Sequence, residues 1–282
     1  MLFGAAIFFT DYSIGPVELA RALEERGFES LWAPEHSHIP ASRKTPYPGG
    51  GELPKEYYHV MDPFVTLSAA AAATKKLKVA TGICLVQQRD VIQTAKLVAS
   101  VDQVSRGRFL FGIGGGWNQD EMENHGTQFE TRFQRVRESI EAMKEIWTKD
   151  QAAYHGEIVK FGPIFAWPKP VQKPHPPIIV GGGWPQGARR AIRYGDGWLP
   201  IISADGLGKI LPQYKTMAKE AGRDISAVPI TAWHAKLESD AITRFQDLGV
   251  ARIVTTLPPA GAEKILPILD RCAEMIVKAK SD

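Results

Sequence analysis

Hydrophobic and polar positions repeat one pattern along almost the whole chain: a short apolar run, a turn, and an amphipathic stretch of helical period. The first unit places a strand at Phe3–Phe9 and a helix at Pro16–Arg26. Apolar residues recur at helical spacing in the second segment, a proline stands at its start, and Gly27 follows its end. These signals predict a chain of alternating strands and helices.

Seven further units follow, which makes eight in all. The other strands are expected at Ser30–Ala33, Lys78–Val86, Arg108–Ile113, Pro177–Val180, Gly197–Ile202, Val228–Trp233 and Arg252–Thr256. The other helices are expected at Asp62–Lys76, Asp90–Ser105, Gln134–Trp147, Gly187–Tyr194, Leu207–Ala221, Ala241–Leu248 and Ala262–Val277. Short, uniformly apolar strands are typical of a parallel sheet covered by helices. The fold class predicted is therefore α/β, a single (β/α)8 TIM barrel over residues 1–282 rather than an open doubly wound sheet.

Two long irregular insertions interrupt the pattern. One follows the second strand at Pro34–Met61 and is rich in Pro, Gly, Tyr and His, and the other precedes the fifth strand at Lys149–Lys173 and contains a candidate hairpin. Segments that follow barrel strands build the sites of such enzymes. We therefore expect both insertions to wall a pocket at the mouth of the barrel.

The composition argues against several classes of protein. Of the 282 residues, 44% are hydrophobic and 23% are charged, which is close to the globular average and argues against disorder. The net charge is only +3 and the basic residues are scattered, so we expect no nucleic-acid partner. The first apolar run has no basic flank and ends at Asp11, which argues against a signal peptide or a membrane span and favours the cytoplasm. Cys84 and Cys272 lack metal-type spacing and are expected to be buried thiols.

Two glycine-rich turns are candidates for binding. Gly181–Gly183 follows an apolar strand and precedes a helix, where backbone N–H groups and the helix N-terminus favour a phosphate. The alternative there is a tight turn that needs positive φ. Gly112–Asn118 ends the fourth strand, and its bare backbone can pack against a flat ring. The alternative is close strand packing, with Trp117 covering the end of the barrel.

The segment Glu35–His38 emerges directly from the second strand, where a barrel places catalytic side chains. His36 can transfer a proton near neutral pH if Glu35 or another carboxylate orients its ring. Alternatively, Glu35, His36 and His38 can bind a divalent metal ion. The two histidines can also be hydrogen-bonding loop residues without a chemical role.

Three segments carry a resemblance to a known family. They are SLWAPEHSHIP at residues 30–40, the stretch from VATGICLVQQRD to GIGGGWNQDEM at 79–122, and PKPVQKPHPPIIVGGGWPQGARRAIRYGDGWLP at 168–200. Together they resemble the bacterial luciferase-like monooxygenase superfamily, in particular its branch of probable deazaflavin (coenzyme F-420)-dependent oxidoreductases. The likeness extends over nearly the whole chain.

The resemblance implies a homodimeric oxidoreductase or monooxygenase that binds FMN or coenzyme F-420 and acts on a small organic substrate. It places the cofactor ring in the barrel mouth, its phosphate near the turn after the fifth strand, and His36 beside the ring as the catalytic candidate. The cofactor-binding residues that it implies are Glu35, Thr81, Gly82, Gly114, Gly115, Gly116, Asn118, Gly181 and Gly182. Thr81 and Gly82 match a strand end at which members frequently carry a non-prolyl cis peptide bond. With FMN the reaction is expected to be monooxygenation, and with deazaflavin hydride transfer.

Some positions depart from the family pattern. Trp117 stands where some deazaflavin dehydrogenases have a catalytic acid, so we do not carry that mechanism over. Asn118 and Glu121 are polar candidates at the same rim without an assigned role. Two other functions remain as alternatives: a metal-dependent TIM-barrel lyase or isomerase that uses Glu35, His36 and His38, and a cofactor-binding protein without catalysis of its own.

Overall fold

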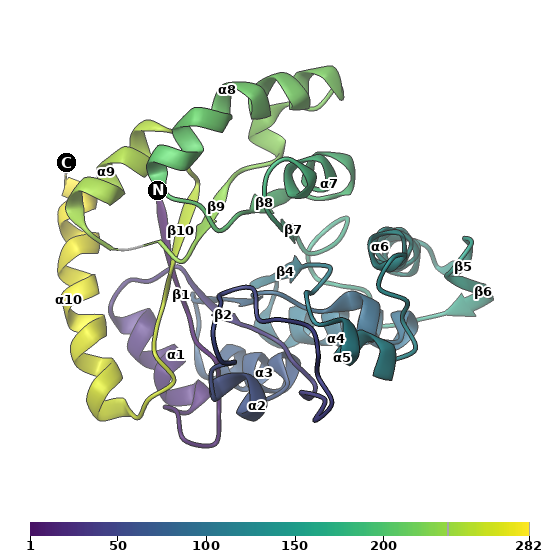
Figure 1. Cartoon of the computed structure of the whole chain (residues 1–282), viewed down its shortest axis with the longest axis horizontal. Coiled ribbons are helices and arrows are strands. Elements are labelled where there is room, and N and C mark those ends of the chain that lie inside the picture. Colours follow the sequence, from purple (N-terminus) through teal and green to yellow (C-terminus); the bar gives the residue numbers. More distant parts are fainter. Residues whose placement is uncertain (236, 282) are drawn as a thin grey trace.

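The structure is a computed structural model that describes residues 1–235 and 237–281. A barrel of parallel strands lies at its centre, and helices surround it (Figure 1). The barrel strands are β1 Leu2–Ala6, β2 Ser30–Ala33, β3 Lys78–Thr81, β4 Phe109–Ile113, β7 Ile178–Gly181, β8 Gly197–Leu199, β9 Thr231–Trp233 and β10 Arg252–Thr256. The predicted TIM-barrel fold is confirmed.

The barrel is closed by weaker pairing at one seam. The hydrogen-bonded order is β8-β7-β4-β3-β2-β1-β10-β9, and every ladder in it is parallel. Between β8 and β9 the pairing consists of the isolated bridges Trp198–Ile230 and Ile201–Trp233. All eight strands therefore point the same way, and their C-terminal ends meet at one mouth.

One long helix follows each barrel strand. These helices are α1 Pro16–Glu25, α3 Pro63–Ala73, α4 Val91–Ser105, α6 Arg132–Thr148, α7 Gln186–Tyr194, α8 Ala204–Glu220, α9 Ser239–Asp247 and α10 Ala262–Ser281. Shorter elements are α2 Glu56–His59, α5 Gln119–Asn124 and the 3-10 helices η1 Val86–Gln88 and η2 Ile225–Ala227. No helix among the described residues has the length and apolar character needed to cross a membrane.

Several predicted strands were too long. The first was expected to reach Phe9 but ends at Ala6, and the third was expected to reach Val86 but ends at Thr81. The apolar pattern continues beyond these ends because Ile7, Phe9 and Val86 are buried in the loops. Burial, rather than sheet pairing, explains their apolar character.

The core has two parts, inside and outside the barrel wall. The inner cluster takes one residue from each barrel strand: Ala6, Trp32, Ala80, Leu110, Ile179, Leu199, Trp233 and Val254. The indole rings of Trp32 and Trp233 meet edge to face, with centroids 5.7 Å apart. The outer cluster fills the space between strands and helices. Cys84 and Cys272 are buried free thiols, as predicted.

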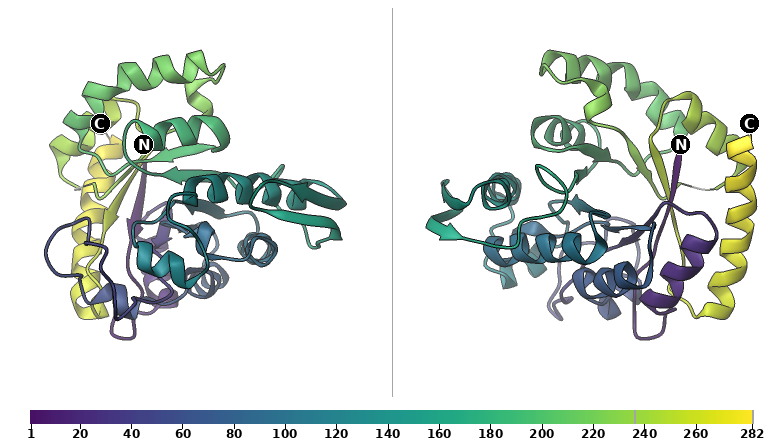
Figure 2. Two further views of the ribbon diagram at one scale, coloured as in Figure 1. Left: turned by 45° about the vertical axis from the view of Figure 1, so that its right-hand side comes forward. Right: turned by 180° about the vertical axis from the view of Figure 1, so that it is seen from behind.

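The two insertions have different positions. Pro34–Met61, which includes α2, lies beside the barrel mouth, and Tyr47 and Tyr57 from it line the cavity there. The second insertion forms the antiparallel hairpin β5 Gln151–His155 and β6 Lys160–Phe165, which packs on α6 and extends away from the barrel (Figures 1 and 2). The expectation that this second insertion walls the mouth pocket was wrong, because Glu138 of α6 accepts hydrogen bonds from the backbone of the hairpin loop and holds it outside.

At the opposite end of the barrel, an ion pair joins strands that are far apart in the sequence. Arg252 at the start of β10 donates to both carboxylate oxygens of Glu29, just before β2, at 2.6 and 2.7 Å, and also donates to Thr231 of β9. Lys78 Nζ of β3 lies 3.1 Å from the same carboxylate. Burial opposes ionisation of Glu29, but the hydrogen bonds and charge of Arg252 outweigh it and lower the pKa of this carboxyl.

We predict that Glu29→Gln lowers the free energy of unfolding at pH 7 by roughly 2–3 kcal/mol, because it leaves Arg252 largely buried without its charged partner. Since the pKa of Glu29 is lowered by folding, its contribution is present above the unfolded-state pKa and is lost as pH falls through the folded-state value. The difference between variant and wild type in urea unfolding should therefore shrink below about pH 4. Glu25→Gln, at an exposed position on α1, is the control and should change stability by less than about 0.5 kcal/mol. Equal effects of the two substitutions would contradict this account.

Candidate functional site

A cavity of about 600 Å³ opens at the C-terminal ends of the strands. Its size lies within the usual range for small-molecule sites. Gly82 and Trp233 contribute to it from the barrel, His36 and Trp117 follow β2 and β4, and Tyr57 comes from the first insertion. The cavity therefore lies where the strand ends converge, as the sequence predicted for the active site.

His36 is held in one orientation by a buried carboxylate. Its Nδ1 donates to Oε2 of Glu121 at 2.7 Å, and the Glu121 side chain is fully buried. The other oxygen of Glu121 accepts from the backbone N–H of Ser37 at 3.0 Å. A carboxylate that accepts a hydrogen bond from Nδ1 holds the proton of a neutral imidazole on that nitrogen and leaves Nε2 unprotonated. His36 Nε2 has no protein partner among the described residues, so it can accept or donate a proton.

The carboxylate that orients His36 is thus Glu121 and not Glu35. Glu35 lies in the cavity wall, but its two oxygens accept from the backbone N–H of Leu85 at 2.7 Å and from Arg89 Nε at 2.5 Å. Arg89 also donates to Asp62 at the start of α3. Glu35 therefore connects the end of β2 to the loop after β3.

The residues considered for a metal ion do not converge. His38 directs Nδ1 to the Ser37 hydroxyl and Nε2 to Asn124, away from the Glu35 carboxylate, which is engaged by Arg89. Within residues 1–235 and 237–281, no group of three or more His, Cys, Asp or Glu side chains is arranged to hold a metal ion. The geometry therefore gives no support to the metal-dependent lyase or isomerase.

Aromatic rings from the first insertion and the β4 loop surround His36. The ring centroids of Tyr57 and Trp117 lie 5.1 and 5.8 Å from that of His36, and Tyr47 lies 5.3 Å from Tyr57. Burial raises the pKa of the Tyr57 phenol, so it stays protonated and donates to Tyr47 Oη at 3.4 Å. Sequence reasoning did not identify either tyrosine, and the only signal was the tyrosine content of the insertion.

A second imidazole lines the cavity from the side of β9. His234 follows Trp233 directly, and its Nδ1 lies 2.6 Å from the hydroxyl of Thr256 at the end of β10. Burial lowers the pKa of His234, which favours its uncharged form at neutral pH. The sequence showed a histidine near a strand end but did not indicate that it shares a cavity with His36.

Bare backbone forms part of the cavity surface. A Cβ atom on Gly82 would lie 2.4 Å from the Trp233 ring, and one on Gly116 would lie 2.9 Å from the amide nitrogen of Gln87. The Gly82–Ile83 peptide bond is cis, as expected for this strand end. Thr81 contributes no side-chain group to the cavity, because it is buried and donates to the carbonyl of Gly112 at 2.6 Å.

The remaining predicted cofactor-binding residues of the β4 loop lie behind this surface. A Cβ atom would meet Ile83 from Gly114 and Phe133 from Gly115, at 2.0 and 2.3 Å respectively. Close packing therefore requires glycine at both positions. Asn118 is 1% exposed, and both polar atoms of its amide lack a partner among the described residues. Unpartnered buried amides are rare, and they fit a bound polar group.

Gly181 and Gly182 lie at the end of β7, beside the cavity rather than in its wall. The Ile83 side chain comes between, because its Cγ2 atom would lie 3.1 Å from a Cβ on Gly181. Gly182 has a φ of +138°, and a Cβ on it would lie 2.9 Å from Arg190 Nη2. The turn thus presents backbone close to the start of α7 and to a guanidinium group.

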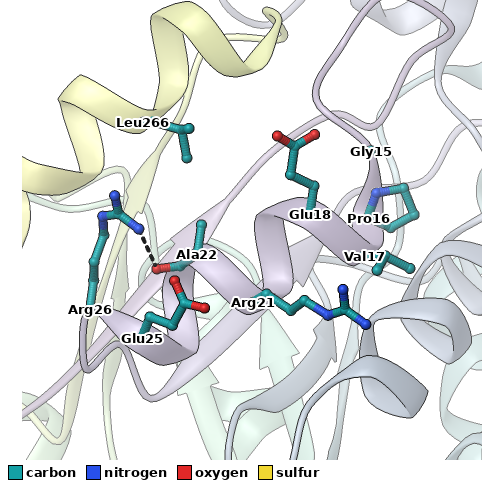
Figure 3. A pocket seen from close by; sticks show the side chains of 9 residues that line it. All are labelled: Gly15, Pro16, Val17, Glu18, Arg21, Ala22, Glu25, Arg26 and Leu266. Atoms are coloured by element: carbon teal, nitrogen blue, oxygen red, sulfur yellow. Dashed lines mark hydrogen bonds between the residues drawn. The ribbon is translucent and has the colours of Figure 1, made fainter.

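A second hollow lies on the outer helical layer and belongs to no strand end. It has a volume of about 550 Å³ and is lined by Gly15–Glu18, Arg21, Ala22, Glu25 and Arg26 of the α1 region and by Leu266 of α10 (Figure 3). Its charged side chains have opposite signs, and Arg26 donates to the backbone carbonyl of Ala22. It lacks the convergent loops of the mouth, so we place the candidate site in the mouth cavity.

The chain is similar in sequence to known proteins along most of its length. The chain is 37% identical to an uncharacterized protein of Mycobacterium tuberculosis over 277 residues, 97% of this chain and 98% of that protein. It is 38% identical over 122 residues, 42% of this chain and 33% of the relative, to the FMNH2-dependent dimethylsulfone monooxygenase of Pseudomonas putida.

Two solved structures share the fold. A monooxygenase from Streptomyces bottropensis superposes with a TM-score of 0.77 at 21% identity, covering 99% of both chains. The coenzyme F-420 dependent tetrahydromethanopterin reductase of Methanopyrus kandleri gives a TM-score of 0.73 at 18% identity, covering 98% of this chain and 96% of that one. The luciferase-like monooxygenase family model matches residues 16–236, well over half of the chain. The protein is therefore a member of the luciferase-like monooxygenase family.

Proposed function

We propose that the protein is an oxidoreductase that uses reduced FMN or coenzyme F-420 to convert a small organic substrate in the mouth cavity. The observation that carries this proposal is the His36–Glu121 pair, which presents one free imidazole nitrogen in a cavity of bare backbone and aromatic rings. Named relatives in the family use one or the other of these cofactors. The alternative of a cofactor-binding protein without catalysis has no comparable support, because it gives no reason for an oriented histidine.

The residues present fit such a cofactor in two respects. Gly82 and Gly116 line the cavity with backbone atoms against which a flat ring can pack, and the unpartnered amide of Asn118 offers a donor and an acceptor at the edge of the same loop. The Gly181–Gly182 turn lies at the start of α7, where backbone N–H groups and the helix N-terminus favour the cofactor phosphate.

The bound cofactor would supply the electrons, for monooxygenation with FMN or for hydride transfer with deazaflavin. The protein would orient the reactants and exclude water, for which Tyr47, Tyr57 and Trp117 supply an apolar wall. His36 would accept or donate a proton at Nε2 while the Glu121 carboxylate stabilises the charged imidazolium. Trp117 supplies bulk and no proton at this position of the β4 loop, and His36 is the proton donor or acceptor that we propose.

We predict that absorbance titration of the purified protein shows binding of FMN, of coenzyme F-420, or of both. Riboflavin, which lacks the phosphate, should bind at least about tenfold more weakly than FMN if FMN is bound, because the β7 turn and α7 would have no anion to contact. No binding of either cofactor would refute the proposed function. Equal affinity for FMN and riboflavin would refute the placement of the phosphate.

We predict that His36→Ala lowers turnover by about 100-fold or more, because general acid–base catalysis contributes roughly 10² to 10⁴. Glu121→Gln should cause a smaller loss, about tenfold, because Nδ1 keeps a hydrogen-bond acceptor but loses the charge. Cofactor affinity should change by less than about twofold in both variants. Turnover is measured with a substrate found by screening small organic compounds in the presence of the bound cofactor.

His155→Ala, on the exposed hairpin, is the matched control for these two variants and should keep wild-type turnover. Wild-type turnover in His36→Ala would remove the assignment of His36.

We also propose that the protein acts in the cytoplasm as a homodimer. The cytoplasm is supported by Cys84 and Cys272, which are both free thiols rather than partners in a disulfide. The dimer is supported by the family resemblance and by exposed apolar side chains such as Val65 and Phe165, which are 71% and 74% exposed. Light scattering after size-exclusion chromatography tests the dimer, and a monomer mass would contradict it.

A further inference from the structure

The mouth cavity adjoins a smaller pocket of about 390 Å³. We call it the side pocket, and it is lined by the loops after β8 and β9 and by one face of α9. Ile201, Trp233 and His234 line both hollows and therefore form the boundary between them. The His36–Glu121 pair lies outside the side pocket. Its volume falls within the usual range for small-molecule sites.

The side pocket lies where the barrel is closed by weaker pairing. Strands β8 and β9 are joined by isolated bridges rather than by a ladder, and the bridge nearer the mouth joins Ile201 to Trp233. The loops that follow these two strands form two walls of the side pocket, and Ala241 and Phe245, one turn apart on α9, form a third. The pocket thus connects the mouth cavity with the helical layer at this seam.

The walls of the side pocket are mainly apolar. Ala204, Ala235 and Phe245 line it and are buried, with exposed fractions of 8%, 5% and 2%. Ile201, on the boundary with the mouth cavity, is 71% exposed. An apolar ligand that covers this aliphatic side chain would remove it from water, which is favourable. The side pocket therefore favours a hydrocarbon group.

The polar groups of the side pocket are few. The Ser203 hydroxyl is already engaged, because it accepts from the backbone N–H of Gly206 at 3.1 Å and caps α8. Glu238 is exposed and is the only carboxylate among the described residues of the lining. The remaining polar side chain in this part of the lining is the imidazole of His234, which stands on the boundary with the mouth cavity.

His234 gives this boundary a group that can hydrogen-bond to a ligand. Its φ is +59°, a left-handed conformation that is uncommon outside glycine and is often found at functional sites. Its Nδ1 lies 2.6 Å from the Thr256 hydroxyl, and its Nε2 has no protein partner among the described residues. Burial lowers the pKa of His234, so the ring is mostly uncharged at neutral pH. An uncharged ring can form one hydrogen bond to a ligand that is otherwise apolar.

We propose that the substrate carries an apolar group of several carbons next to an uncharged polar group, with the apolar group in the side pocket and the polar group at Nε2 of His234. This inference rests on the proposed function, which places the reacting atom in the mouth cavity. Because the two hollows share three walls, one molecule can occupy both. His234 then orients the substrate, and the size of the side pocket limits the length of the apolar group.

The test is a titration of the protein, without cofactor, with the straight-chain alcohols 1-butanol, 1-hexanol and 1-octanol. Binding is followed by NMR of ¹³C-labelled isoleucine methyl groups, because Ile202 lines the side pocket alone and Ile83 lines the mouth cavity alone. Affinity should rise by about fourfold for each methylene group that becomes buried. The Ile202 signal should shift further as the chain lengthens.

Two variants separate the apolar contact from the polar one. Ala241→Leu fills the side pocket from α9, so it should weaken binding of 1-octanol by about tenfold or more and that of 1-butanol by less than about threefold. His234→Phe removes the hydrogen bond to the hydroxyl group, so it should weaken all three alcohols by a similar factor, about three- to tenfold. The matched control is Ala273→Leu on α10, which lines neither hollow and should bind all three alcohols as the wild type does.

Each other outcome overturns a stated part of the inference. The same gain per methylene group in Ala241→Leu as in the wild type, or an Ile202 signal that 1-octanol leaves unshifted, would refute the side pocket as the site of the apolar group. Wild-type affinities in His234→Phe would refute the polar contact. An equal loss in Ala273→Leu would show that the substitutions do not act through the side pocket. Melting temperatures verify that each variant is folded.

These titrations contain no cofactor, so their outcome is independent of the titration with FMN and coenzyme F-420. Failure to bind either cofactor would refute the proposed function and leave the side pocket as a binding site for apolar molecules. Failure of the alcohol series would refute the side pocket and leave the proposed function standing.

Discussion

Carboxylates that hold loops to strand ends determine the shape of the barrel mouth. Glu121 fixes His36 and Ser37, and Glu35 fixes the loop after β3 through the backbone of Leu85. Asp120 accepts from the backbone and hydroxyl of Thr45 in the first insertion, and these hydrogen bonds lower its pKa to about 2. Loops lack the backbone hydrogen bonds between strands that hold a sheet in position. Without the carboxylate contacts, the loops that form the cavity wall would therefore have no fixed conformation.

Carboxylate contacts have different roles at the two ends of the barrel. At the N-terminal end, the ion pair of Glu29 and Arg252 joins β2 to β10 and stabilises the barrel. At the C-terminal end, the acidic groups hold side chains that face the cavity. This division is typical of TIM barrels, in which chemistry gathers at one face and stability at the other.

Much of the fold could be predicted from the sequence because its signals are local. The bounds of β2 and β10 were correct, and helix ends were found within a few residues, since apolar period, proline and glycine mark them. The end of β3 was predicted too late because Val86 is apolar, although it is buried in the loop after the strand and not in the sheet. The site was harder, since the hydrogen bond between His36 and Glu121 spans 85 residues of sequence, and no periodicity encodes such a contact. The sequence marked Glu121 as a polar candidate at the rim of the barrel, but nothing in it linked this residue to His36.

The floor of the cavity consists of atoms that the barrel itself needs. Gly82 lies against Trp233, and Trp233 packs on Trp32 inside the barrel, so a larger side chain at position 82 would displace Trp233 and its contacts in the inner cluster. The opposite wall comes from Tyr47 and Tyr57 in one insertion that no strand ladder uses. Within this architecture, a lineage can acquire a new substrate by exchanging that single segment while the machinery beneath it stays the same. Differences in substrate range among proteins of this design should therefore be sought in the loops, above all in residues 34–61, rather than in the barrel strands.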